Sequence, residues 1–178
     1  LGADIDGDGS VALGYAALAN QESDGANQDV YNVAVGAGAG TLLTSGIENT
    51  IVGGSAASEG AITGDINTVV GYQAGKVLTS GTRNTAVGGI ALDALTTSND
   101  NVAVGWGALT TNITGASNTA LGTTALEVNL AANNTAVGYN ALSANTTGTP
   151  NVAVGHTALA ANTEGNNNIS VGHQTLDA

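Results

Sequence analysis

The chain has 178 residues, of which 42% are hydrophobic but only 3% aromatic, and it contains no Cys, Met or Phe. Two basic residues against 14 acidic ones give a net charge of −12, so we expect no nucleic-acid partner, because phosphate contacts need a basic face. Without Cys there is no disulfide or thiol chemistry, and no apolar run approaches the length of a membrane span, so this segment should not insert into a bilayer.

The N-terminal stretch "DIDGDGS", residues 4–10, carries Asp at alternate positions followed by Gly. This pattern is typical of the opening of a calcium-binding loop. An EF-hand is incomplete here, because Tyr15 occupies the position of the bidentate Glu. The stretch "ANQESDGANQD" that follows Leu18 brings further carboxylates, which either complete a Ca²⁺ site or form a solvated acidic turn. Nothing else in the chain requires a cofactor. The candidate Ca²⁺ ligands are Asp4, Asp6, Asp8, Glu22, Asp24 and Asp29.

A nine-residue motif, "NTAVGYNAL" at residues 134–142, recurs with small changes along the whole chain. Aligned on the Gly that closes "AVG", ten copies are separated by 22, 17, 18, 17, 17, 17, 16, 17 and 17 residues. A fixed period of this kind indicates a repeat architecture. We therefore expect one repeat domain over residues 1–178, with residues 1–31 as an atypical acidic first repeat. The aligned glycines are Gly14, Gly36, Gly53, Gly71, Gly88, Gly105, Gly122, Gly138, Gly155 and Gly172.

Each repeat contains a strand pattern that ends at this Gly. Branched residues stand one and three positions before the Gly, with a mostly Ala position between them, and this alternation predicts a short strand with a small-residue face. Four positions before the Gly, nine repeats have Asn and the first has Ser10. Asn suits turns and forms side-chain ladders when stacked. The clearest structural positions are Asn84, Gly88, Asn101, Gly105, Asn118, Gly122, Asn134, Gly138, Asn151 and Gly155.

After the Gly, most repeats continue with two variable residues and then "AL". We interpret this segment as a second short strand, followed by a polar turn such as "TTNITGAS". A helix is the competing interpretation, but Gly, Thr and Asn at both ends leave it too short to be stable.

The whole pattern predicts an all-β protein, a parallel β-roll (β-solenoid) of about ten 17-residue coils. One such coil cannot bury its apolar face alone, whereas a stack of coils can. At a strand spacing of about 4.8 Å, ten coils form a rod roughly 48 Å long. The branched strand face then leaves a continuous strip of exposed Val, and such a strip usually marks an interface.

The repeated "NTAVGYNAL" with "NTTG" turns resembles the YadA-like head of trimeric autotransporter adhesins and, equally, the shaft repeats of phage tail fibres. The resemblance covers all ten repeats, although the units here are somewhat longer than is typical of the adhesin heads. It implies a left-handed parallel β-roll and a homotrimer packed about a common axis. Because the chain begins at Leu1 and ends inside the motif, we expect it to be a piece of a longer protein.

The position directly after the repeat Gly collects both His residues and every aromatic residue except Tyr31. Such a stripe either stacks on sugar rings or simply covers the neighbouring coil, and its mixture with Gly and Ala favours the second interpretation. His156 and His173 should lie one coil apart, within reach of a shared metal, but the column offers no carboxylate to complete such a site. The candidate ligand surface is Tyr72, Trp106, Tyr139, His156 and His173.

No pair of carboxylates and no Ser-His-Asp arrangement emerges from two His and scattered acids, so we expect no enzyme. Ice binding by Thr columns is a weaker alternative, since Thr alternates with Val. The sequence therefore predicts an extracellular structural and adhesive fibre module that attaches to a host surface protein or glycan. The first hypothesis is the head of a bacterial surface adhesin. The shaft of a phage tail fibre on the virion and a self-assembling surface filament remain alternatives.

Overall fold

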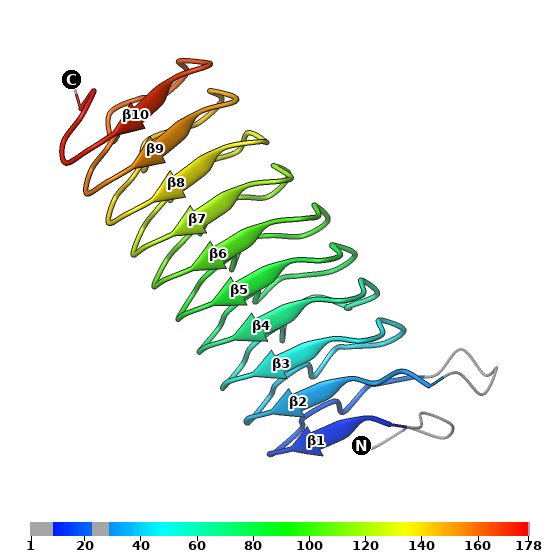
Figure 1. Ribbon diagram of the computed structural model, residues 1–178. Coiled ribbons are helices and arrows are strands. Elements are labelled where there is room, and N and C mark those ends of the chain that lie inside the picture. The colour runs from blue at the N-terminus through cyan, green and yellow to red at the C-terminus, as the bar shows by residue number, and fades with distance from the viewer. Residues whose placement is uncertain (1–8, 23–28, 178) are drawn as a thin grey trace.

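The computed structural model describes residues 9–22 and 29–177, and one sheet of ten parallel strands runs through them from end to end (Figure 1). Each strand pairs only with the strands of the preceding and following coils, in sequence order. The predicted all-β solenoid is therefore confirmed. The strands are β1 (Val11–Leu13), β2 (Val33–Val35), β3 (Thr50–Val52), β4 (Thr68–Val70), β5 (Thr85–Val87), β6 (Val102–Val104), β7 (Thr119–Leu121), β8 (Thr135–Val137), β9 (Val152–Val154) and β10 (Ile169–Val171).

The strands pair in register, so each column of the aligned sequence becomes a row in space. Between β8 and β9, Ala136 lies opposite Ala153 and Val137 lies opposite Val154. The middle residue of each strand points inward and its two neighbours point outward, which is the period-2 alternation of a strand. Ala136 is fully buried, as the small-residue column predicts.

The core is thin and consists mainly of the Ala of each strand and the "AL" pair of each turn, for example Ala136, Ala141 and Leu142. Where Gly replaces the turn Leu, a larger strand residue fills the space. A Cβ built on Gly75 would lie 3.3 Å from Cγ1 of Val69. Ile51 likewise packs beside Gly40. A larger side chain in the middle of the strand thus compensates for the missing Leu side chain in the turn, and the core stays closely packed.

The predicted second strand is wrong. The "xxAL" segment forms turns in which every second residue has a positive φ, as Asn140 and Leu142 do, each with a φ of 52°. Its backbone still bonds to neighbouring coils in both directions. The Asn140 N–H donates to the Thr123 carbonyl (3.1 Å), and the Leu142 N–H donates to the Ala158 carbonyl (2.9 Å). The segment is therefore a stacked turn that satisfies its backbone without being extended.

One of these left-handed positions predicts a stabilising substitution. Thr157 has a φ of 52°, and its Oγ1 atom is buried without a hydrogen-bond partner. Asn140 occupies the same position in the preceding coil, and Asn tolerates this conformation better than a β-branched residue. We expect Thr157→Asn to raise the free energy of unfolding by up to about 1 kcal/mol in urea titrations. A loss of stability would instead show that packing of the Thr157 methyl group outweighs the backbone strain.

Candidate functional site

A buried ladder of Asn side chains joins successive coils, as predicted. The Asn134 N–H donates to Asn118 Oδ1 (2.9 Å), and the Asn151 N–H donates in turn to Asn134 Oδ1 (2.8 Å). Asn134 Nδ2 also donates to the carbonyl of Gly148 (2.9 Å), in the turn that leads to the next strand. In the first coil, Ser10 Oγ accepts the corresponding N–H of Asn32 (3.2 Å). The ladder ties strand to turn and coil to coil, so its role is structural.

A second Asn ladder, which the sequence analysis missed, lies inside the C-terminal coils. Asn145 Nδ2 donates to Asn129 Oδ1 (2.7 Å), and Asn162 Nδ2 donates to Asn145 Oδ1 (3.0 Å). The position is seven residues after the repeat Gly. Three of the five earlier coils have Leu there, whereas the first has Gln21 and the third has Gly60. The 16- and 17-residue spacing of these Asn was the signal that could have revealed the ladder. In chain order the position is occupied by Gln21, Leu43, Gly60, Leu78, Leu95, Asn112, Asn129, Asn145 and Asn162.

The outward side chains of the sheet form two columns of branched residues, which we name the outer sheet face. They occupy the positions one and three residues before each repeat Gly. In β8, for example, Thr135 and Val137 remain partly exposed on either side of the buried Ala136. Within the described chain, no other segment buries these columns. The most exposed apolar members are Val11, Leu13, Val102, Leu121, Ile169 and Val171.

The position after each repeat Gly forms a further exposed column, which we name the aromatic column. In the last three coils its rings stack on one another. The ring centroids of Tyr139 and His156 are 5.1 Å apart, and those of His156 and His173 are 5.0 Å apart with an interplanar angle of 18°. The predicted proximity of the two His residues is therefore confirmed. Nearly parallel rings do not converge their nitrogen atoms on one point, so a shared metal would require both rings to turn.

The predicted N-terminal Ca²⁺ site falls largely outside the described residues, which do not include Asp4, Asp6, Asp8 and Asp24. Glu22 and Asp29 are described and exposed, and Asp29 Oδ2 accepts a hydrogen bond from the Tyr31 hydroxyl (2.6 Å). Among residues 9–22 and 29–177, no three His, Cys, Asp or Glu side chains are grouped to hold a metal ion. Calcium binding at this end stays a prediction.

Both basic side chains pair with carboxylates of neighbouring coils. Lys76 Nζ lies 3.0 Å from Glu59 Oε1, and Arg83 Nε lies 2.7 Å from Asp100 Oδ1. The hydrogen bond from Arg83 lowers the pKa of Asp100. The contribution of this pair to stability is therefore lost as the pH falls through that lowered pKa.

Asp93 shows the opposite shift and predicts a second stabilising substitution. Burial raises the pKa of Asp93, although Lys76 counteracts this, and Asp93 Oδ1 has no hydrogen-bond partner. A raised pKa in the folded state means that the ionised carboxylate opposes folding at neutral pH and that this penalty fades on acidification. We expect Asp93→Asn to melt at a higher temperature than the parent at pH 7, with a smaller difference at pH 3. A lower melting temperature at pH 7 would show that attraction to Lys76 dominates.

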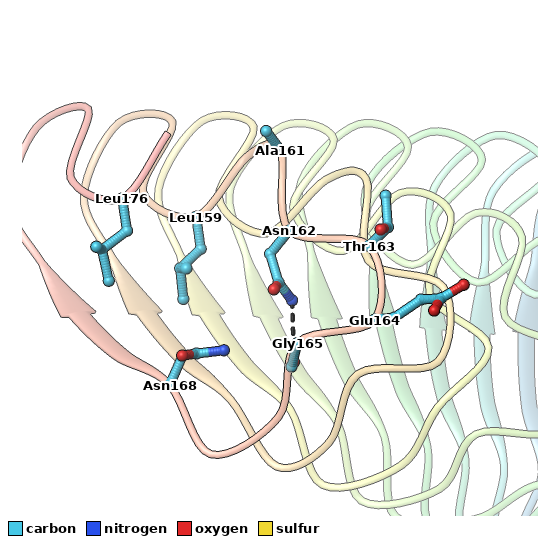
Figure 2. Close-up of a pocket in the computed structure, with 8 residues that line it drawn as sticks. All are labelled: Leu159, Ala161, Asn162, Thr163, Glu164, Gly165, Asn168 and Leu176. Atoms are coloured by element: carbon cyan, nitrogen blue, oxygen red, sulfur yellow. Dashed lines mark hydrogen bonds between the residues drawn. The ribbon is translucent and has the colours of Figure 1, made fainter. Parts of the chain in front are cut away.

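Two hollows occur near the C-terminal end of the stack. The larger, about 370 Å³, is the open interior of the last coils, where Leu159 and Leu176 lie beside Asn162 and its hydrogen bond to the Gly165 carbonyl (Figure 2). Among the described residues that line it, Glu164 alone is titratable. The smaller, about 300 Å³, lies beside Pro150, Val152 and Ile169. Neither hollow brings together two titratable groups of the described residues.

Nothing within residues 9–22 and 29–177 forms a helix of the length and apolarity that crossing a membrane requires. No known protein family, curated protein or solved structure matches the sequence.

Proposed function

We propose that the chain is a non-enzymatic, extracellular attachment module, in which three copies pack their outer sheet faces about a common axis. The assembly is a rigid rod that presents its turns and its aromatic column to a host surface. In this role the chain is the head of a bacterial surface adhesin or, with the same architecture, the shaft of a phage tail fibre.

The observation that carries the proposal is the outer sheet face. Two columns of branched residues run along all ten strands and remain partly exposed in the single chain, most of all in β1 and β10. The column one position before the repeat Gly is Val or Leu in all ten strands, whereas the other column is Thr in five of them. A contiguous apolar strip of this length usually marks an interface. Burying each half-exposed Val or Leu contributes on the order of 1 kcal/mol. Ten strands multiply that contribution, so a self-complementary strip of this kind favours association.

Paired charge substitutions test this packing. We expect Val102→Asp/Leu121→Asp, which places carboxylates in both columns of the outer sheet face, to abolish the trimer in light-scattering measurements. Ile113→Asp/Leu130→Asp is the matched control in the same two coils. Its turn side chains are 48% and 45% exposed, against 37% and 45% for the sheet pair. Equal masses for the two variants would contradict packing through the sheet.

Retention assays test attachment itself. Microspheres coated with the chain should be held under flow by animal cells if the module is an adhesin head, or by bacterial cells if it belongs to a tail fibre. Microspheres coated with the Val102→Asp/Leu121→Asp variant, whose chains should not assemble, should be held less well. Retention of parent and bare microspheres to the same extent on both cell types would count against an attachment role.

A self-assembling filament is the second candidate, because β1 and β10 each pair on one side only among the described strands. Unpaired strand edges are templates for further strand addition. Electron microscopy of the purified chain distinguishes this candidate: filaments that lengthen with concentration favour it, and short particles of constant length argue against it.

A further inference from the structure

The aromatic column has two different arrangements along the rod. In the last three coils Tyr139, His156 and His173 stack, so their faces are occupied by one another. In the middle coils, rings alternate with small residues. Tyr72 and Trp106 are 63% and 57% exposed, and the residues before, between and after them in the column are Gly54, Gly89 and Thr123.

The small residues provide a seat for each ring. A Cβ built on Gly89 would lie 3.3 Å from Cδ1 of Trp106 and 3.7 Å from its Nε1, so the indole rests against Gly89. A Cβ on Gly54 would lie 3.7 Å from Cδ2 of Tyr72. Each ring thus leans on the backbone of the preceding coil. Within the described chain, no ring stacks on either of them. Tyr72 and Trp106 therefore keep more than half of their surface exposed.

The two rings lie two coils apart, which is about 9.6 Å at the usual spacing of neighbouring strands. An extended β-1,4-linked glycan advances by about one strand spacing per sugar, so its alternate sugars match this interval. Aromatic side chains offer a flat apolar face suited to the C–H face of a pyranose. We propose that Tyr72 and Trp106 form a binding track for an extended, neutral β-1,4-linked glycan that lies along the rod axis.

The electrostatics favour a neutral glycan over an acidic one. The net charge is −12, and both basic side chains are paired, Lys76 with Glu59 and Arg83 with Asp100. A uronate or sulfated polysaccharide would meet uncompensated negative charge along the rod, which disfavours its approach. The assignment rests on the proposed attachment function and gives it a chemical class of receptor.

Trp106 is the single Trp of the chain, so its fluorescence reports directly on this track. The probes are cellohexaose, which is extended, and maltohexaose, which contains the same sugar in an α-linked, curved chain. We expect cellohexaose to change the Trp106 emission saturably and to bind at least tenfold more tightly than maltohexaose. Equal affinities, or no saturable change with cellohexaose, would overturn the proposal.

Three variants localise the binding. Tyr72→Ala should weaken cellohexaose binding roughly tenfold by fluorescence. Trp106→Thr, which introduces the residue found at this position in the next coil (Thr123), should weaken cellohexaose binding by a similar factor when it is measured by calorimetry. Tyr139→Ala, in the closed stack, should change the affinity less than twofold. An equal loss from Tyr139→Ala would place binding elsewhere and contradict the assignment.

Measurements on the same sample separate the two proposals. If the chain is a trimer by light scattering and cells hold the microspheres coated with it, but cellohexaose does not bind, only the glycan track is refuted. Cellohexaose binding by a monomeric chain supports the track and refutes the trimeric module. Strong protection of Trp106 from acrylamide quenching in the trimer would place the ring in the subunit interface and overturn the track.

Discussion

Replacement of Gly53 by Ala is expected to destabilise the chain by about 3 kcal/mol or more. Gly53 closes β3 with a φ of +135°, a conformation that L-residues rarely adopt. A Cβ at this position would lie 2.4 Å from the carbonyl oxygen of Gly71 in the next coil, which cannot move without breaking the stack. The midpoint of thermal unfolding, followed by far-UV circular dichroism, should therefore fall steeply.

The adjacent residue is the matched control. Gly54 has no left-handed φ, and a Cβ there would meet only Cδ2 of Tyr72 at 3.7 Å. Ala37 already occupies the equivalent position in the preceding coil. Gly54→Ala should keep the free energy of unfolding within about 0.5 kcal/mol of the parent. Equal effects of the two neighbouring substitutions would show that the backbones at Gly53 and Gly71 are not in tight contact.

The second large effect is expected for Asn134→Asp. Asn134 is fully buried, and its Nδ2 donates to the Gly148 carbonyl and to Asn129 Oδ1. An Asp carboxylate would place an acceptor against these two oxygens and bury a charge without a partner. We expect a loss of about 3–5 kcal/mol at pH 7. Because burial disfavours the ionised form, part of this loss should be recovered as the pH falls.

Asn133→Asp provides the control at the preceding position. Asn133 is exposed, and its φ of 60° is one that Asp accepts as readily as Asn. Both variants add one negative charge to the same coil, so urea titrations isolate the effect of burial. Similar losses for both variants would show that added charge, and not the buried ladder, limits the stability.

The columns of the sequence were sufficient to predict the sheet, because three residues of each repeat differ in the space they need. Ala136 faces inward, where only a small side chain fits. Val137 faces outward, as do the residues at the same position of the other coils. The "xxAL" segment was not predictable in the same way. Leu rarely adopts a left-handed conformation, so nothing in the identity of Leu142 indicates its φ of 52°.

The candidate site was predictable only in part. The spacing of the repeats placed His156 and His173 one coil apart, and the structure stacks them at 5.0 Å. The exposure of Trp106 and Tyr72 depends on the direction in which each ring leans, and the residue identities alone do not specify that direction. The interior ladder through Asn129 and Asn145 was missed because buried Asn is unusual unless its partners are in place.

We propose above all that the outer sheet face joins three chains, and the solution mass tests this proposal most directly. Size-exclusion chromatography with multi-angle light scattering should give about three times the chain mass of 17.1 kDa, unchanged over a wide range of protein concentrations. A mass equal to that of a single chain at every concentration would contradict the account, and the outer sheet face would then be a free surface of a self-sufficient solenoid.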